Sequence, residues 1–381
     1  MRDVAILGIG QSQFGKFPEK SISQLGHQAV TEAIKEAGIK PKEIQVAYTS
    51  RLYLDMITGQ NILKDIGITD IEMINVENAC AGGSTAVRCL WKDIAVGLYD
   101  IGIATGVESM TTSPIARKLI PPAKDDLDGQ MGLTMPSYFA LIARRLMEKY
   151  GAVKEDFAQV SVKNHRHGCL NPRAQYQKEF TIEEVLNSRI IAEPITLLEC
   201  CPNTDGAAAV ILCSMDVARK HTTNPVKIVA SALLSGDYFF KKEDLTSFSM
   251  GKKTAQKAYE MAGIGPEDLD VIELHDAFAC EEIVHYEDLG ICRPGEGIEL
   301  LRAGDTSLGG RIPVNLSGGL LSLGHPLSAS GVRVVCELTL QLRGQAGKRQ
   351  KPGAKVGLAQ MLGGMANGLE AGACGINILT R

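Results

Sequence analysis

The chain has 381 residues, of which 45% are hydrophobic and 22% are charged, and its formal net charge is −4. This composition is typical of a globular protein large enough for two domains, and it excludes both a disordered chain and strong nonspecific binding to nucleic acid. No basic stretch precedes a cleavage site at the N-terminus, and no apolar run approaches the roughly 18 residues of a membrane span, so we expect a cytoplasmic protein.

Strand and helix signals alternate along the first 110 residues, which is typical of an α/β domain. Residues 3–10 predict a buried strand, and residues 21–38 predict a helix that begins at a Ser21 cap and ends at Gly38. A strand, a helix and a further strand are predicted at residues 46–50, 84–98 and 99–109.

The rhythm breaks from about residue 111 to residue 190, where a helical pattern at 136–151 is flanked by polar and proline-containing segments. We interpret this region as an insertion into the α/β fold.

A weak internal repeat relates the two ends of the chain. The segment "AGIKPKEIQV" that begins at Ala37 returns as "AGIGPEDLDV" beginning at Ala262, 225 residues later, and each copy is followed by a glycine-rich turn. We therefore predict a duplicated α/β fold with an N-terminal half at 1–225 and a C-terminal half at 226–381, and a site where equivalent turns of the halves meet.

Three polar groups stand in such turns: Cys80 in "NACAGG", His275 in "VIELHDAF", and His325 between Gly324 and Pro326. A thiolate is a strong nucleophile, and a neighbouring imidazole can take its proton, so this combination is suited to covalent catalysis. The alternative is ordinary packing, because free cysteine is among the most buried residue types. None of the ten cysteines forms a CxxC pair, so we expect neither a zinc site nor a disulfide framework.

Four segments in this order resemble the thiolase family, specifically its sterol-carrier-protein-2 type: "NACAGGSTA", "PNTDGAAAVIL", "ELHDAF" and "SGGLLSLGHPLSASG". The resemblance extends over nearly the whole chain. It implies two βαβαβαββ halves stacked in five αβαβα layers, with a loop domain inserted in the first half that helps to bind coenzyme A.

The resemblance also implies roles for individual residues. Cys80 would be the acylated nucleophile, His325 its base, and His275 an oxyanion partner for the substrate oxygen. The backbone N–H groups of Cys80 and Gly363 would hold the thioester oxygen of the acyl-enzyme. Coenzyme A would be a substrate, and no cofactor or metal would be tightly bound.

One departure from the family pattern concerns the second catalytic cysteine. Met361 and Ala277 stand at the two positions where thiolases carry it, and neither side chain can transfer a proton. Cys280 is a candidate substitute three residues beyond Ala277, and the alternative is that it is a buried core thiol. His275 or an ordered water could also protonate the leaving enolate.

The HDAF variant resembles thiolases that work beside a small zinc-ribbon and OB-fold protein, among them benzoylsuccinyl-CoA thiolase and acetoacetyl-CoA thiolases. The resemblance implies a homodimer or homotetramer with such a partner subunit. Four cations of the insertion, Arg117, Lys118, Arg166 and Arg173, are candidates to contact CoA phosphates or a substrate carboxylate, although cationic loop side chains are often simply solvated.

The sequence thus predicts an acyltransferase that cleaves a 3-oxoacyl-CoA with CoA, with an aromatic or branched substrate such as benzoylsuccinyl-CoA, or else an acetoacetyl-CoA-forming thiolase that runs the reverse condensation. Two other hypotheses remain. A decarboxylating ketosynthase would use the same Cys-His-His set on a malonyl thioester, and a non-catalytic acyl-CoA carrier would keep the fold without acylating Cys80.

Overall fold

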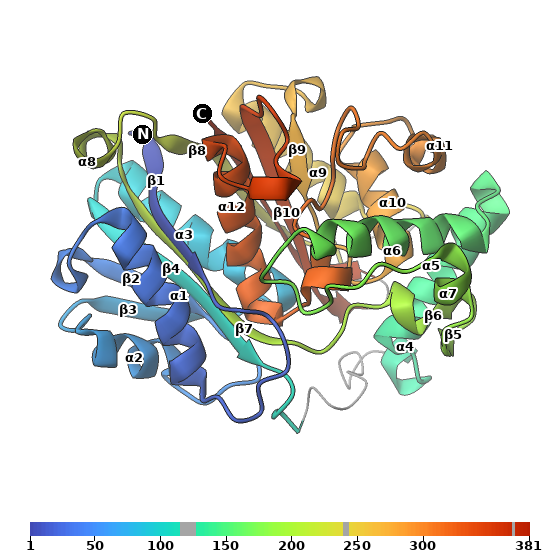
Figure 1. The fold of residues 1–381 in the computed structure, drawn as a ribbon, viewed down its shortest axis with the longest axis horizontal. Coiled ribbons are helices and arrows are strands. Elements are labelled where there is room, and N and C mark those ends of the chain that lie inside the picture. Colours follow the sequence, from blue (N-terminus) through green and yellow to red (C-terminus); the bar gives the residue numbers. More distant parts are fainter. Residues whose placement is uncertain (115–126, 239–243, 368–369) are drawn as a thin grey trace.

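The computed structural model describes residues 1–114, 127–238, 244–367 and 370–381. In these residues nine strands form one mixed sheet in the order β3-β2-β4-β7-β1-β8-β11-β10-β9 (Figure 1). The strands are β1 (Val4–Gln11), β2 (Val46–Ser50), β3 (Glu72–Val76), β4 (Ile101–Ser109), β7 (Asp205–Ser214), β8 (Val226–Ser235), β9 (Val271–Glu273), β10 (Val356–Asn367) and β11 (Glu370–Thr380).

The two halves repeat the same strand pairing, which confirms the predicted duplication. In the first half β2 is parallel to β4, β4 is antiparallel to β7, and β7 is antiparallel to β1. In the second half β9 is parallel to β10, β10 is antiparallel to β11, and β11 is antiparallel to β8. The first residues of β2 and β9, Val46 and Val271, are 271 − 46 = 225 positions apart, the spacing of the sequence repeat.

The main helices are α1 (Ile22–Ala37), α2 (Thr58–Leu63), α3 (Gly82–Val96), α8 (Met215–His221), α9 (Ser249–Ala262), α10 (Ala279–Asp288), α11 (Gly297–Arg302) and α12 (Leu327–Arg343). Helix α1 packs on strands of the first half and α9 on strands of the second, whereas α3 and α12 contact each other and strands of both halves. The layers are therefore α1, first half-sheet, α3 with α12, second half-sheet and α9, in agreement with the predicted five-layer fold. Hydrogen bonds between β1 and β8 join the two half-sheets at one edge.

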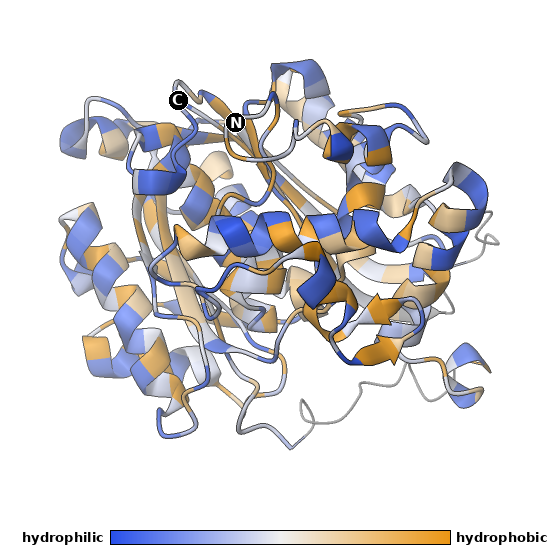
Figure 2. Cartoon of the chain, turned by 45° about the vertical axis from the view of Figure 1, so that its right-hand side comes forward, coloured by the Kyte–Doolittle hydropathy of each residue, from blue (hydrophilic) through white to orange (hydrophobic). Residues whose placement is uncertain are grey.

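The predicted first helix shows how closely local signals set its bounds. Ser21 Oγ accepts a hydrogen bond from the Gln24 backbone N–H, and the Gln24 side chain accepts one from the Ser21 N–H, which completes a capping box. Gly38 ends the helix at φ +67°, a conformation that glycine adopts without strain. In Figure 2 the outer helices show both hydrophobic and hydrophilic residues along their length, as expected for helices with one buried face.

Helices α3 and α12 cross at two glycines. A Cβ atom on Gly83 would lie 2.7 Å from the backbone nitrogen of Val332, and one on Gly331 would lie 2.9 Å from the carbonyl carbon of Gly83. Only residues without a side chain permit this approach. The crossing brings the N-terminal ends of both helices to the centre of the molecule, where Cys80 and His325 precede them.

The insertion runs from the end of β4 to the start of β7, and thus continues beyond the expected boundary near residue 190. Its described elements are α4 (Leu127–Gln130), α5 (Met135–Tyr150), α6 (Lys154–Cys169), α7 (Ile182–Leu186), β5 (Ile190–Ala192) and β6 (Ile195–Thr196). The pattern at 136–151 correctly predicted α5. Helix α6 was not predicted, because the side chains that it buries include the polar groups of Lys163, Asn164 and His167.

Candidate active site

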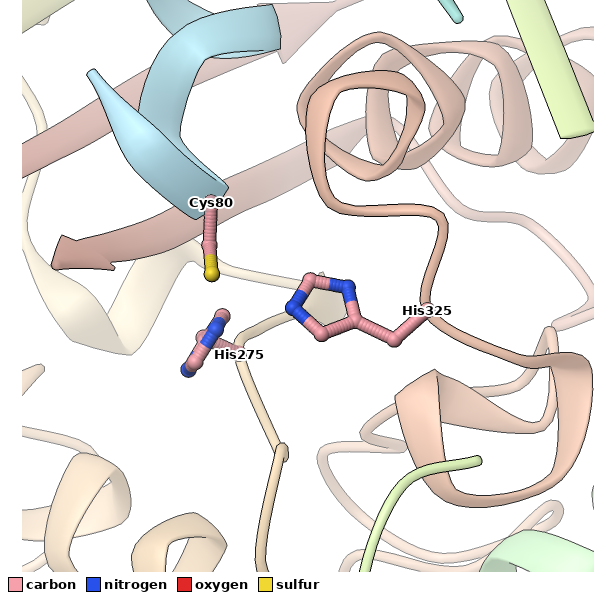
Figure 3. Close-up of side chains that lie close together, drawn as sticks. All are labelled: Cys80, His275 and His325. Carbon is pink, nitrogen blue, oxygen red and sulfur yellow. The ribbon is translucent and has the colours of Figure 1, made fainter. Parts of the chain in front are cut away.

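Three turns that are far apart in the sequence meet at the centre of the fold. Cys80 lies in a short 3₁₀ turn (Ala79–Ala81) before α3, His275 follows β9, and His325 precedes α12. The Cys80 sulfur and one ring nitrogen of each histidine lie within 4.8 Å of one another, and both imidazoles approach the sulfur from below in Figure 3. The ring centroids of the two histidines are 5.3 Å apart with an interplanar angle of 80°. The structure therefore brings together the three side chains that the sequence singled out.

The turn that carries Cys80 has an unusual backbone. Ala79 has φ +47°, a left-handed conformation that costs a non-glycine residue about 1 kcal/mol or more. The turn is also closely packed against β10, because a Cβ atom on Gly363 would lie 2.6 Å from the backbone nitrogen of Ala81. Cys80 itself stays partly exposed. The sulfur is thus presented on a fixed turn beside the backbone of Gly363.

The tautomer of His325 follows from its hydrogen bonds. Ser330 donates its hydroxyl to the Pro326 carbonyl oxygen at 3.1 Å, so its oxygen accepts from His325 Nδ1, 2.8 Å away. The proton is therefore on Nδ1, and the buried Nε2, which has no protein partner, offers a lone pair. Burial, reinforced by the positive charges of His275 and Arg333, lowers the pKa of His325 well below 6.5. His325 is consequently neutral and can accept a proton.

His275 has the opposite charge state because of Glu281, the third residue of α10. Burial alone would lower the pKa of His275, but the Glu281 carboxylate, which accepts from Nδ1 at 2.8 Å, and the neighbouring Cys80 sulfur raise it to about 10. The Glu281 carboxylate also accepts from the Ala277 N–H at 3.1 Å and lies 3.3 Å from His285 Nε2. His275 and His285 overcome the burial that would raise the pKa of Glu281, and they lower that pKa to about 2.

Glu281 and His285 were missed by the sequence analysis. Both side chains are buried in α10. Glu281 follows His275 by six residues, but only the position of α10 shows that its carboxylate turns back toward the imidazole. With Glu281 ionised, the buried Nε2 of His275, which has no protein partner, carries a proton and can donate it to an oxygen in the site.

Asp276 connects the His275 turn to the His325 turn. Its carboxylate accepts hydrogen bonds from the Leu320 N–H at 2.6 Å and from Asn164 Nδ2 at 2.8 Å. A Cβ atom on Gly319 would lie 2.8 Å from the Asp276 carboxyl carbon, so the π-helical turn Gly319–Leu323 can close over Asp276 only with glycine there. The insertion thus supports the site through α6, which contributes Asn164.

The other predicted site residues lie elsewhere. Cys280 is 1% exposed and its thiol contacts the Phe139 carbonyl oxygen at 3.4 Å, and burial raises its pKa well above 9. Arg166 lies 3.7 Å from Glu179 on the surface, and Arg173 pairs with Glu32. Arg117 and Lys118 fall outside the described residues.

The donor atoms of Cys80, His275 and His325 are close enough to share a metal ion. Coordination would require a lone pair on each imidazole, so a metal ion would have to displace the Nε2 proton of His275, whose pKa is raised to about 10. A nucleophilic sulfur, a neutral base and a cationic N–H donor instead form a set suited to acyl transfer. Among the described residues, no helix is long and apolar enough to cross a membrane.

Comparison with known proteins supports this chemistry. Residues 4–216 match the family description "Thiolase, N-terminal domain", and residues 232–370 match "Thiolase C-terminal domain-like". The chain is 39% identical to an acetyl-CoA acetyltransferase of Methanothermobacter thermautotrophicus, with all of both chains covered. It is 39% identical to the benzoylsuccinyl-CoA thiolase subunit BbsB of Thauera aromatica over 95% of each chain, and 38% identical to sterol carrier protein 2 of Bos taurus over 94% of this chain and 70% of the relative.

Among solved structures, an Ltp2-ChsH2(DUF35) aldolase is similar over 100% of this chain and 98% of the aldolase chain, with a TM-score of 0.86 and 26% identity. The family matches together span both halves of the molecule.

Proposed function

Since this chain belongs to the thiolase family and is an acyltransferase of that family, we propose that it cleaves a 3-oxoacyl-CoA with CoA through an acyl thioester on Cys80. The observation that carries the proposal is the meeting of the Cys80 sulfur with a neutral His325 and a cationic His275 within 4.8 Å.

In the first half-reaction, His325 Nε2 takes the proton of Cys80, and the thiolate attacks C3 of the substrate. The protonated His275 donates a hydrogen bond to the substrate oxygen on which negative charge develops. The bond between C2 and C3 breaks, the acyl group stays on Cys80, and the remaining CoA ester leaves as an enolate that takes up a proton at C2.

In the second half-reaction, the CoA thiol attacks the acyl carbon on Cys80 and the Cys80 sulfur leaves. The backbone N–H groups of Cys80 and Gly363 are our candidates for the donors to the thioester oxygen. Their proximity is supported by the close packing of Gly363 on the turn that contains Cys80.

For the substrate we propose an aromatic or branched 3-oxoacyl-CoA such as benzoylsuccinyl-CoA, which is consistent with the 39% identity to the subunit BbsB. Acetoacetyl-CoA is the second candidate, because the acetyl-CoA acetyltransferase of M. thermautotrophicus is equally similar over the whole chain. Arg166 and Arg173 remain candidates for contacts with CoA or a substrate carboxylate, and each would have to release a glutamate to make them.

We further propose that the chain works as a homo-oligomer with a second protein component, for which we expect a small zinc-ribbon and OB-fold chain. The support is that one relative is named a subunit and that the name of the similar solved structure joins Ltp2 with ChsH2(DUF35).

The test is intact-protein mass after brief incubation with acetoacetyl-CoA or benzoylsuccinyl-CoA, with and without the partner chain. Wild type is expected to gain an acyl group that disappears on addition of CoA. The Cys80→Ser variant should show no CoA-sensitive adduct, whereas Cys89→Ser, a control at another partly exposed cysteine, should behave as wild type.

Two outcomes would contradict the proposal. Saturable CoA binding without any acylation of Cys80 would favour a carrier function. Acylation accompanied by loss of carbon dioxide from a malonyl thioester, without thiolysis, would favour a ketosynthase.

A further inference from the structure

The proposed thiolysis requires a proton donor at C2 of the substrate. When the C2–C3 bond breaks, its electron pair stays on the CoA ester and must take up a proton. In the cluster described above, His325 holds the proton of Cys80 and His275 binds oxygen. Ala277 and Met361 are buried side chains without a titratable group.

Cys280 does not lie where it could serve this purpose. Its thiol contacts the Phe139 carbonyl oxygen and packs among core residues of α5 and α10. Burial and the charges of Glu281, Glu199 and Cys200 raise its pKa well above 9.

Cys201, which precedes the "PNTDG" segment, lies directly opposite Ala277. The Cys201 N–H donates to the Ala277 carbonyl oxygen at 2.8 Å, and the neighbouring pair Cys200 and Phe278 forms an antiparallel bridge. Residues directly opposite each other in an antiparallel pair project their side chains to the same face, with Cβ atoms about 4.5–5.5 Å apart. The backbone pairing therefore places the Cys201 side chain on the same face as the Ala277 methyl group, and Ala277 is two residues after His275 in the chain.

The adjacent Cys200 provides the contrast, because successive side chains of an extended segment point to opposite faces. The Cys200 thiol contacts the Thr196 carbonyl oxygen at 3.3 Å and lies near Cys280. The electrostatic neighbours of Cys201 instead include Cys80 and Asp276. Of these two partly exposed cysteines, Cys201 is the one that has Cys80 among its electrostatic neighbours.

We infer that the Cys201 thiol is the acid that protonates C2 in thiolysis and the base that removes a C2 proton in the reverse condensation. This inference rests on the proposed function. It assigns the second thiol of the reaction to the segment that pairs with Ala277, whose methyl group cannot carry a proton.

The proton balance closes without a further reactant. Cys201 gives its S–H proton to C2, which completes the released acyl-CoA and leaves a Cys201 thiolate. The incoming CoA thiol gives its proton to that thiolate, and the CoA sulfur attacks the acyl carbon on Cys80. The departing Cys80 thiolate recovers its own proton from His325, so one proton enters with CoA and leaves on C2.

Two observations support this assignment. Burial raises the pKa of Cys201 well above 9, so the group carries its proton at neutral pH and is ready to act as an acid. The buried Nε2 atoms of His275 and His325 have no protein partner, which is expected if all of these groups face a space that substrate fills.

The test separates acylation from proton transfer. Each variant is incubated with acetyl-CoA in D₂O, and two quantities are measured: acyl transfer to Cys80 by intact mass, and deuterium incorporation at C2 of acetyl-CoA. The Cys201→Ala variant is expected to lose about 100-fold or more of the C2 exchange rate while acylation changes by less than about threefold. Cys200→Ala is the matched control and should keep both rates.

A relocated thiol sharpens the test. The double variant Cys201→Ala/Ala277→Cys should recover at least about tenfold of the lost exchange, because the new thiol lies on the same face; a merely structural role for Cys201 predicts no such rescue. Cys201→Ser conserves volume if the alanine variant does not fold, and it should lose exchange similarly.

Wild-type exchange in a folded Cys201→Ala or Cys201→Ser variant with intact acylation would overturn the inference, as would acylating wild type that shows no C2 exchange. Absence of acylation of wild type by acetyl-CoA, acetoacetyl-CoA and benzoylsuccinyl-CoA alike would instead refute the proposed function itself.

Discussion

Cys80 and Ser328 occupy matching positions in the two halves, since each lies three residues before the glycine at which α3 and α12 cross, Gly83 or Gly331. Their surroundings differ. Cys80 faces two histidines, whereas Ser328 is fully buried and donates its hydroxyl to the Glu108 carboxylate at 2.7 Å. The matching position is therefore a partly exposed thiol in a 3₁₀ turn before α3 in one half and a satisfied hydroxyl inside α12 in the other.

The surrounding positions follow the same rule. Ser50 and His275 both lie four residues after the first residue of the matching strands β2 and β9. Glu108 and Gly363 both lie six residues beyond the partners of those first residues on β4 and β10. In the first half this position is Glu108, whose pKa burial raises to about 7. In the second half it is Gly363, which offers only its backbone. Duplication thus supplies the frame, and a few side chains decide which turn is reactive.

The largest expected effect tests the matching pair Cys80 and Ser328. Cys80→Ala should lower kcat for thiolysis by about 10⁴-fold or more, because no other group can carry the acyl intermediate. Ser328→Ala should change kcat by less than about threefold, since its hydroxyl serves Glu108. Steady-state thiolysis of acetoacetyl-CoA or benzoylsuccinyl-CoA measures both, and a comparable loss in a folded Ser328→Ala protein would contradict the asymmetry.

The second pair is His275 and Ser50. His275→Gln removes a cationic donor but keeps a similar shape, and kcat should fall by about 10²- to 10³-fold. Ser50→Ala should leave kcat within about threefold, because the Ser50 hydroxyl forms no hydrogen bond to another described residue and lies against Gly82. The same kinetic assay applies, and equal losses would mean that both pockets contribute to catalysis.

The ionisable groups beside Cys80 and beside Ser328 should also differ in how they make stability depend on pH. The pKa of His275 is raised from 6.5 to about 10, so its stabilisation is present in full below pH 6.5 and is lost as the pH rises through 10. Its partner Glu281, whose pKa is lowered from 4.5 to about 2, contributes stability that is lost only as the pH falls through 2. The free energy of unfolding should therefore fall by roughly a few kcal/mol between pH 7 and pH 10.

Chemical denaturation of three proteins tests this difference. Glu281→Gln should remove most of the slope between pH 7 and 10. Glu108→Gln should leave that slope and remove a different one between about pH 4.5 and 7, because the raised pKa of Glu108 makes its contribution fall through that window as the pH rises. An unchanged profile in both variants would show that neither pocket controls the pH dependence.

The smallest expected effect concerns the crossing of the two halves. Gly331→Ala places a methyl group against the Gly83 backbone and should lower the free energy of unfolding by about 1–3 kcal/mol, with reduced kcat because Cys80 and His325 precede the crossing helices. Gly344→Ala at the far end of α12, with φ +73° and open space around it, should cost about 1 kcal/mol and leave kcat unchanged. Thermal or chemical unfolding compares the two.

Much of the fold and site was predictable because the signals are local. A capping serine, a terminal glycine and a helical apolar period set α1 within one residue, and glycine-rich turns identified Cys80, His275 and His325. The repeat at 225 residues predicted the matching strands. Helix α6 was missed, because its buried polar residues conceal the apolar face on which such predictions depend.

What the sequence by itself determined is the duplicated α/β fold, its family and the three turns that carry a nucleophile and two imidazoles, since each depends on residues adjacent in the chain. Only the tertiary structure decided the charge states and the neighbours: Glu281 keeps His275 protonated, Ser330 sets the tautomer of His325, and a backbone hydrogen bond beside an isolated bridge places Cys201 opposite Ala277. Charge and proton transfer depend on distances across the fold, and those distances follow from the packing of α3 and α12 between the two half-sheets.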